Sequence, residues 1–528
     1  MAVNPVKTPF TKMTWTPDVP SSSLGPNEYN IGENIETDVR SIKSVKGDEY
    51  ILSVIPGNII FATGGFRTDT NWWYIVATDE GKWYGIDEAG YTNLTPATGF
   101  NGSGYSVHLP ITESWNGTVL FINDQINPPM YLLPTDTQFR LYDHGPDNYI
   151  WNYNPDWSKL TAGFMRLYSS PNLGSILIAG NLTADVISTG TTLNYPNTVR
   201  WSQNFGLNSG PTTWAPTLVN TANELEVPVR GPVIDGFPLH GNFYVLSYWD
   251  MVVFSPIAYQ SSTAPVFGVK LMNQGRGLLN ENCWVNVDDT VFGIDARDIW
   301  QFDGGSFNPV GNQRVKDYFY TNLNSNYTNQ VFMEHNSSRY QIEIYYPDLN
   351  STGTCNKMIS YRYDLDCWNP PRDVTLATMT TEGPTWTGTK FDIGTRTVVY
   401  GSFQGNVALV QKDTGTSFLN DAPISSIFQR DNISFGQPYS AKIQVHRVLP
   451  EVYGTGNIEI TVGGASSVAA NVIYRPTVSM PIATEHPWVQ IDQNDSRVVS
   501  IQVTSNTNST SWQMTAANWQ ITQVEDDR

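Results

Sequence analysis

The stretch "TVFGIDARDIWQFDGG", residues 290–305, is the clearest guide to the fold. Phe292 and Ile294 alternate with small or polar neighbours, and so do Trp300 and Phe302. A period of two is typical of half-buried strands, and the Asp-Ala-Arg-Asp segment between them is typical of a tight reversal. The stretch therefore predicts one β-hairpin in which Phe292 and Ile294 pack against Trp300 and Phe302.

Three aspartates of this stretch, Asp295, Asp298 and Asp303, raise the question of chemistry. Carboxylates this close could bind calcium, but their order is not the Asp-x-Asp-x-Asp-Gly order of a calcium loop. Aspartate side chains also accept hydrogen bonds from the backbone of their own turn. We therefore interpret all three as turn formers.

Similar units recur along the chain, each a short apolar strand, a polar turn and a second strand. Examples are "NWWYIVATDEGKWYGIDEAG", "GTVLFINDQINPPMYL" and "NFYVLSYWDMVVFSP". About six or seven such units recur roughly every 40 to 60 residues, and a radial array of four-stranded blades produces this kind of repetition. The sequence predicts an all-β protein with a β-propeller-like domain of about six to seven blades over residues 36–415, with several separate sandwiches as the alternative.

The two ends of the chain differ from this pattern. Residues 1–35 are rich in proline and predict an extended N-terminal arm that is a candidate for contact with a neighbouring subunit. Residues 416–528 contain longer alternating strands and predict a C-terminal antiparallel β-sandwich. Its expected core residues are Ile443, Val445, Ile458, Ile460, Val462, Val499, Ile501, Val503, Trp512, Met514, Trp519 and Ile521.

One helix is expected among these strands. In residues 312–324, Val315, Phe319 and Leu323 are spaced four apart, which places them on one helical face. This segment directly follows the hairpin of residues 290–305. The sequence thus predicts a short helix at this position.

The composition limits the classes of function. Of the 528 residues 15% are charged, and 30 basic against 49 acidic residues give a net charge of −19. Binding to nucleic acid by phosphate neutralisation needs clustered Lys and Arg, so this balance argues against it. Carboxylates lining a channel would instead repel phosphate and let DNA pass, although a solvated acidic surface is the more ordinary explanation of the charge. The N-terminus has no signal-peptide pattern and no apolar run could span a bilayer, so we expect a soluble chain made in a cytoplasm without membrane insertion.

No catalytic, cofactor or metal site is predicted. The six histidines lie singly, and no nucleophile elbow or phosphate-binding loop occurs. Of the three cysteines, Cys355 and Cys367 could face each other across a hairpin, but free buried thiols are favoured. We therefore expect a protein that is not an enzyme.

Propeller glycosidases and lectins are the competing class. The segment "TDEGKW", residues 78–83, is similar to the Asp box of sialidases, but its tryptophan comes one residue early and the match does not repeat. Seventeen tryptophans could supply sugar-stacking platforms, yet Trp201, Trp214, Trp300 and Trp368 have the sequence context of core residues. This alternative predicts an aromatic-lined pocket with paired carboxylates in each monomer.

Four stretches, in their order, resemble the tail nozzle and packaged-DNA stabilisation (tail tube) proteins of short-tailed bacteriophages. They are "VRWSQNFGLNSGPTTW" (199–214), the hairpin of 290–305 with its sequel "SFNPVGNQRVKDYF", "ISYRYDLDCWNPP" (359–371), and the closing strands "VLPEVYGTGNIEITVGG" and "SWQMTAANWQIT". Together they cover roughly residues 195–528.

The resemblance implies a bacteriophage virion structural protein. It implies a homo-oligomeric ring, expected to be a hexamer, below the portal and the adaptor or head-tail connector. Such a ring retains the packaged DNA, lets genomic double-stranded DNA pass during ejection without sequence-specific binding, and docks tail fibres or spikes. It implies a location in the virion tail after synthesis in the bacterial host cytoplasm, with no catalytic residues and no cofactor. A propeller-type glycan-binding or glycan-hydrolysing tail protein that recognises the host surface is the alternative.

Overall fold

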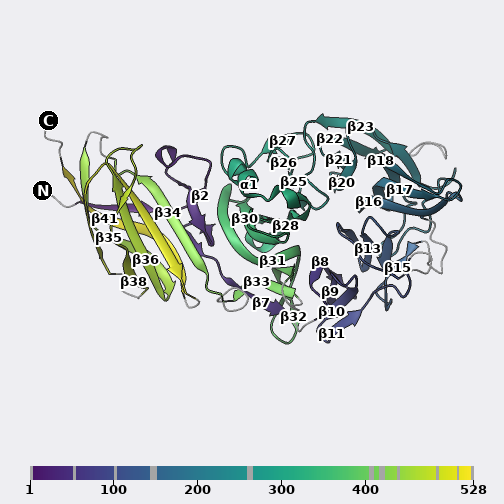
Figure 1. Cartoon of the computed structure of the whole chain (residues 1–528), viewed down its shortest axis with the longest axis horizontal. Coiled ribbons are helices and arrows are strands. Elements are labelled where there is room, and N and C mark those ends of the chain that lie inside the picture. The colour runs from purple at the N-terminus through teal and green to yellow at the C-terminus, as the bar shows by residue number, and fades with distance from the viewer. Residues whose placement is uncertain are drawn as a thin grey trace.

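The described residues of this computed structural model form sheets almost throughout, as predicted. In Figure 1 a ring of sheets occupies one side of the molecule, and a sandwich that contains both chain ends occupies the other. The structure describes residues 4–51, 55–99, 104–142, 151–257, 266–403, 409–415, 422–436, 441–482, 487–507 and 510–524. In these ranges, no helix is long and apolar enough to cross a bilayer.

Five antiparallel sheets of four strands follow one another along the ring. Each is a meander, and several neighbouring sheets contact each other through their first strands, which lie innermost there. The strands of blades 1 and 2 are β8 (Ile59–Phe66), β9 (Trp72–Thr78), β10 (Trp83–Asp87), β11 (Gly90–Asn93), β12 (Thr112–Asn116), β13 (Val119–Asn123), β14 (Met130–Leu132) and β15 (Arg140–Leu141). The strands of blades 3 to 5 are β16 (Trp157–Ser170), β17 (Gly174–Val186), β18 (Thr191–Trp201), β19 (Asn223–Glu226), β20 (Val233–Leu239), β21 (Asn242–Ser247), β22 (Asp250–Pro256), β23 (Phe267–Gln274), β24 (Trp284–Val287), β25 (Thr290–Ile294), β26 (Ile299–Phe302) and β27 (Phe307–Pro309).

The sixth sheet has seven strands and is centred on one long strand, β31. β31 pairs with β30 up to Ala377 and with β32 from Ala377 onwards. Leu376, at the change of partner, has a φ of 43°, in the left-handed region. In sheet order, the strands are β28 (Phe332–Asn336), β29 (Gln341–Tyr346), β30 (Cys355–Arg362), β31 (Cys367–Trp386), β32 (Phe391–Ser402), β33 (Leu409–Gly415) and β7 (Gly47–Ile51).

This sheet is folded into two blades. Lys412 of β33 forms a buried ion pair with Glu343 of β29, although β29 and β33 are four strands apart in the sheet. Strands four apart in a flat sheet lie roughly 19 Å from each other, too far for a direct ion pair. An apolar layer fills the fold between the two halves, with Phe332 and Tyr345 on one side and Tyr400 and Val410 on the other. The described residues therefore form seven blades, within the predicted six to seven.

The ring is closed by strand β7, which precedes blade 1 in the sequence and pairs with β33 of the last blade. A core cluster that includes Ile59, Tyr74, Phe391 and Val399 packs blade 7 against blade 1. Further clusters fill the spaces between successive blades. The hydrophobic cores of the propeller are thus the layers between its sheets.

The hairpin of residues 290–305 is present as β25 and β26, but its side chains pack differently from the prediction. Gly293 lies opposite Trp300 in the register, so Phe292 and Ile294 point away from Trp300 and Phe302. Phe292 and Ile294 belong to the core shared with blade 6, whereas Trp300 and Phe302 face blade 4. The expectation that the two pairs pack against each other is wrong, because residues that alternate in the register occupy opposite faces of the sheet.

The C-terminal region forms a two-sheet sandwich whose twelve predicted core residues all belong to one core cluster. One sheet contains β39 (Val489–Ser496), β35 (Lys442–Thr455), β41 (Ser511–Val524), β6 (Ser41–Ser44), β5 (Ile35–Asp38) and β1 (Asn4–Pro9). The other contains β37 (Ile473–Tyr474), β38 (Val478–Pro481), β36 (Asn457–Ala465), β40 (Val498–Asn506), β34 (Ser425–Ile433) and β4 (Ile31–Glu33). The expected start at residue 416 lies outside the described residues.

The N-terminal arm docks on its own chain. β1 pairs with β41 in one sheet of the sandwich, and β4 pairs with β34 in the other. Between them lie the short parallel strands β2 (Thr14–Trp15) and β3 (Glu28–Tyr29) and the 3-10 turn Ser21–Ser23. β5 and β6 also pair within the sandwich, so residues 35–44 extend the arm beyond the expected limit at residue 35.

The predicted helix is α1 (Lys316–Asn322). Val315, Phe319 and Leu323 are all buried in the core that joins the propeller to the sandwich, which confirms the helical face. Two 3-10 segments, Ser325–Gln330 and Ser337–Arg339, follow it.

Candidate functional site

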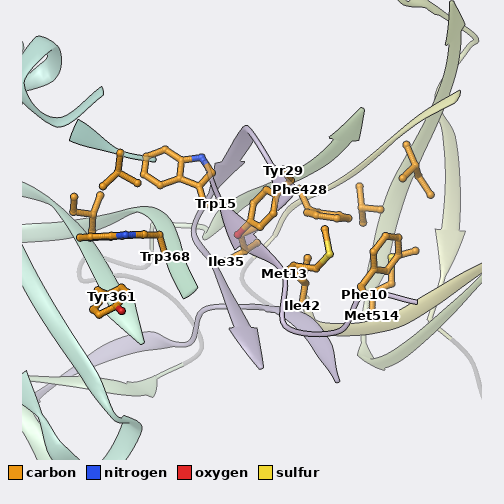
Figure 2. Close-up of a cluster of buried hydrophobic side chains, with 14 of the residues drawn as sticks. Phe10, Met13, Trp15, Tyr29, Ile35, Ile42, Tyr361, Trp368, Phe428 and Met514 are labelled. Atoms are coloured by element: carbon orange, nitrogen blue, oxygen red, sulfur yellow. The ribbon is translucent and has the colours of Figure 1, made fainter. Parts of the chain in front are cut away.

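The joint between propeller and sandwich is the most extensive core of the molecule (Figure 2). Trp15 of the arm lies in a T-shaped contact with Tyr318 of α1, with ring centroids 4.7 Å apart. Toward the sandwich, Tyr29 lies 5.3 Å from Phe428 of β34 by the same measure. One continuous apolar layer therefore runs from the propeller through the arm into the sandwich.

Hydrogen bonds fix the geometry of this joint. The Trp368 indole nitrogen donates to the carbonyl oxygen of Val310 at 3.1 Å, and the Trp368 backbone N–H donates to the Thr14 hydroxyl at 3.0 Å. The Asp18 carboxylate accepts from the backbone N–H groups of Asp317 and Tyr318, at 2.9 and 2.8 Å, at the start of α1. Directional bonds in addition to apolar packing hold the two parts in one orientation.

An ionic cluster lies in the fold between blades 6 and 7. Besides the Lys412–Glu343 pair, Arg372 contacts Asp48 of the closing strand β7 at 2.7 Å and is also paired with Asp413. A buried ion pair adds little net stability, but removing one partner leaves an uncompensated charge. The cluster therefore makes closure of the propeller depend on matched charges.

Burial and neighbouring charges shift the pKa values of this cluster. Burial raises the pKa of Asp48. Burial acts in the same direction on Asp413, but the charges of Arg372 and Arg339 outweigh it and hold its pKa below the usual value. Burial also raises the pKa of Glu334 to about 8, and the nearby carboxylates of Glu343 and Glu382 contribute to this rise. Glu334 is thus protonated at neutral pH.

A pocket of about 370 Å³ opens on the face of the propeller between blades 7 and 1, and is called the propeller pocket below. It is formed by the β8–β9 and β10–β11 turns of blade 1 and by the start of β32 of blade 7. In an antiparallel meander the first and third turns lie at the same end of the sheet, so the two turns of blade 1 reach one face together. The lining residues are Arg67, Thr68, Thr70, Asn71, Trp72, Trp73, Asp87, Glu88, Ala89, Phe391 and Ile393.

Aromatic rings and paired carboxylates meet in the propeller pocket. Trp72 is half-buried, and Phe391 forms the wall contributed by blade 7. One oxygen of Asp87 accepts from Ala89 N–H at 2.9 Å, and one oxygen of Glu88 accepts from Phe391 N–H at 2.8 Å. The second oxygen of each carboxylate accepts no hydrogen bond from a described residue. The volume of the propeller pocket and the kinds of residue that line it are typical of sites that bind small ligands.

The residues considered for chemistry from the sequence have structural roles. Asp295 accepts from the backbone N–H groups of Arg297 and Asp298, and Asp303 accepts from those of Gly305 and Ser306, which confirms the turn interpretation. The residues of "TDEGKW" form the β9–β10 turn, and none of them lines the propeller pocket.

The three cysteines are free and buried. In the register Cys355 lies opposite Ala377, whereas Cys367 lies opposite Arg362, so the two thiols do not face each other across the hairpin. Burial raises the pKa of the Cys283 thiol and that of the Cys355 thiol, which keeps both protonated. Among the described residues, no group of three His, Cys, Asp or Glu side chains is placed to hold a metal ion.

Sequence reasoning missed the propeller pocket. Its residues come from segments more than 300 positions apart, and Asp87 and Glu88 have the sequence context of an ordinary turn. The pair of carboxylates beside an aromatic strand was the only available signal, and nothing in the sequence brings the start of β32 next to them.

The fold defines a class of protein, a seven-bladed β-propeller joined to a β-sandwich through a shared hydrophobic core. No protein-family model matches the chain, and no curated protein matches it. The solved structure of U3-55K is similar over 70% of this chain and 100% of that chain, with 6% identity and a TM-score of 0.36. At this TM-score the likeness carries no argument about function.

Proposed function

We propose that the chain is a structural protein of a bacteriophage virion tail, a nozzle or tail-tube component. In this proposal a homo-oligomeric ring, expected to be a hexamer, forms a channel below the portal and adaptor. The channel retains packaged DNA, lets it pass during ejection, and offers docking positions for fibres. The protein would be made in the bacterial host cytoplasm and would act without catalysis or a cofactor.

The single observation that carries this proposal is the joint between propeller and sandwich. Three of the four stretches that resemble nozzle proteins contribute to its core. Val310 and Phe319 come from the hairpin sequel, Trp368 comes from residues 359–371, and Trp519 comes from the closing strands. Segments that are far apart in the sequence thus share one structural task, which is to hold two parts of a subunit in fixed orientation. A ring that resists internal DNA pressure requires subunits of this kind.

The net charge of the chain also supports the nozzle proposal. A net charge of −19 opposes adhesion of phosphate groups to the subunit surface. We expect the channel face of the assembled ring to be acidic.

The test is electron cryo-microscopy of the intact particle. The expected result is a ring of copies of this chain below the adaptor, with an axial opening that accommodates duplex DNA. A chain absent from the tail axis would refute the nozzle assignment. A ring lined with Lys and Arg would refute the account of DNA passage while leaving the assignment in place.

The propeller pocket favours a second candidate function, glycan binding at the host surface. The half-buried Trp72 ring can stack on a pyranose ring, while carboxylates and the Asn71 amide can bind the sugar's hydroxyl groups. The test is glycan-array binding followed by titration of any hit against Trp72→Ala. Loss of binding in that variant, with binding retained in Trp249→Ala at an exposed tryptophan elsewhere, would support this function. Equal binding by both variants, or no hit, would reject the pocket as a glycan site.

A further inference from the structure

Three buried polar side chains from different strands meet in the fold between blades 6 and 7, and are called the buried triad below. They are Asn336 at the end of β28, Glu343 on β29 and Lys412 on β33. All three are buried, and Glu343 and Lys412 are fully so. A lysine is almost never fully buried unless its surroundings give it a specific partner. The buried triad is therefore a place to look for chemistry.

A single carboxylate oxygen brings the lysine and the asparagine together. Glu343 Oε1 accepts hydrogen bonds from Asn336 Nδ2 at 2.8 Å and from Lys412 Nζ. Two groups that bond the same oxygen lie side by side, so Lys412 Nζ is next to the Asn336 side-chain amide. The other Glu343 oxygen accepts from the Tyr345 hydroxyl at 2.6 Å, which fixes the orientation of the carboxylate.

The Asn336 amide is held at its carbonyl end as well. Ser338 Oγ donates a hydrogen bond to Asn336 Oδ1 at 2.8 Å. A donor at this oxygen stabilises the negative charge that develops there when a nucleophile adds to the carbonyl carbon. The amide thus has a donor at its oxygen and a carboxylate at its nitrogen, which is the arrangement that favours loss of the nitrogen.

The surroundings of the buried triad favour neutral groups over charged ones. The apolar layer between the two blades includes Phe332, Tyr345 and Tyr400. Burial penalises an ammonium and a carboxylate more than it penalises an amine and a carboxylic acid. Transfer of one proton from Lys412 to Glu343 through their existing hydrogen bond produces the neutral amine, which is a nucleophile.

The other carboxylates near the buried triad are engaged elsewhere or neutral. Asp413 lies 3.6 Å from Lys412, outside hydrogen-bonding distance, and bonds to Arg372 instead. Glu334 lies opposite Glu343 in the register and is protonated at neutral pH, because burial raises its pKa to about 8. Glu343 is therefore the carboxylate that exchanges a proton with Lys412.

We propose that Lys412 and Asn336 join in an intramolecular isopeptide bond, with Glu343 as the group that carries the protons. The Nζ lone pair of neutral Lys412 adds to the side-chain carbonyl carbon of Asn336. Glu343 passes its proton to Nδ2, the bond between that carbon and Nδ2 breaks, and its electron pair leaves with ammonia. Glu343 takes up the second Nζ proton as the new amide forms, so the step balances without an oxidant or a reductant.

The isopeptide bond ties β28 of blade 6 to β33 of blade 7. β33 is also the strand with which β7 closes the ring. A cross-link between residues 336 and 412 restricts the unfolded chain and prevents these two blades from separating. The reaction is a single step of the chain on itself, and the nozzle proposal does not depend on it.

The experiment is mass spectrometry of the full-length protein under denaturing conditions. The expected mass is lower than that of the unlinked chain by one ammonia molecule. Trypsin should fail to cleave after Lys412 and should release peptide 317–339 joined to peptide 397–430. Recovery of peptides 317–339 and 397–412 as separate species, with no joined product, would overturn the proposal.

The chain contains its own control, in which the same residue types meet at a more exposed site. Asp373 accepts from Lys357 at 2.5 Å and from the Asn34 amide nitrogen at 2.8 Å, but its side chain is 41% exposed. Burial alone would lower the pKa of the Lys357 ammonium, but the charges of Asp373 and Glu33 outweigh burial and raise it. Lys357 therefore stays protonated, and trypsin should release the linear peptide 340–357. A link at Lys357 as well would refute the role of burial.

Two substitutions test the assigned roles. Glu343→Gln keeps both reacting side chains and should abolish the link, and Asn336→Ala should abolish it by removing the carbonyl group. A link that persists in Glu343→Gln would refute the role of Glu343, and a loss of ammonia that persists in Asn336→Ala would place the reaction elsewhere. The wild-type digest decides the proposal even if a variant does not fold. None of these measurements needs a virion, so their failure would leave the nozzle proposal untouched.

Discussion

The indole nitrogen of Trp368 donates a hydrogen bond to the carbonyl oxygen of Val310 at 3.1 Å. Trp368 belongs to β31 of blade 6, and Val310 follows β27 of blade 5. The bond therefore connects two blades at the position where α1 and the N-terminal arm enter the core. Because the apolar layer around this bond continues into the sandwich, the bond helps to hold the propeller blades together and also to orient the sandwich on the propeller.

Replacement of Trp368 tests that link. Trp368→Ala should destabilise the protein by about 3–5 kcal/mol, since it removes a fully buried aromatic ring. Trp368→Phe, which keeps a ring but loses the hydrogen bond, should cost less. Urea unfolding followed by tryptophan fluorescence measures both. Trp249→Ala, at a side chain that is 46% exposed, is the matched control and should change stability little. An equal effect at both positions would contradict the importance of the joint.

The Lys412–Glu343 pair should show strong energetic coupling. Lys412→Met leaves the buried Glu343 carboxylate without its cation and should cost about 3–5 kcal/mol. Adding Glu343→Gln to this variant should restore part of the loss, because the remaining amide is neutral. A double-mutant cycle of unfolding free energies measures the coupling. Additive effects of the two substitutions would mean that the fold between blades 6 and 7 does not depend on this pair.

Glu334 should make stability fall as the pH rises. Its pKa is raised from 4.5 to about 8 by burial, so the folded state keeps a proton that the unfolded chain releases above pH 4.5. The free energy of unfolding should therefore decrease between pH 4.5 and 8 by up to about 1.4 kcal/mol per pH unit, and this contribution should be constant above pH 8. Glu334→Gln should flatten the profile, while Glu49→Gln at an exposed position should not. Parallel profiles for wild type and Glu334→Gln would refute the assignment.

Gly293 should tolerate no side chain. A Cβ atom at this position would lie 2.2 Å from the Trp300 ring, which covers the glycine from the neighbouring strand. Gly293→Ala should cost about 1–3 kcal/mol, the range for overpacking a core. Gly104→Ala, where a Cβ would meet nothing within 4 Å, provides the control in the same thermal unfolding assay. A melting temperature unchanged by Gly293→Ala would show that Trp300 moves aside without cost.

Local patterns determined the elements of this protein. The period of two in residues 290–305, the four-residue spacing of Val315, Phe319 and Leu323, and the alternation in the last hundred residues predicted a hairpin, a helix and a sandwich core, and all three are present. The aspartates of the hairpin also act as predicted, because turn hydrogen bonds involve only near neighbours in the sequence.

Only the tertiary structure decided how these elements combine. The change of partner at Ala377, the closure of the ring by β7 and the docking of the arm on its own sandwich each join strands that the sequence pattern leaves unassigned. The same holds for the propeller pocket, since it arises where distant segments meet. The alternation of apolar residues along a strand indicates which of its residues are buried. This alternation does not indicate which other strand or sheet covers these residues, because strand pairing depends on packing and charge balance over the whole chain.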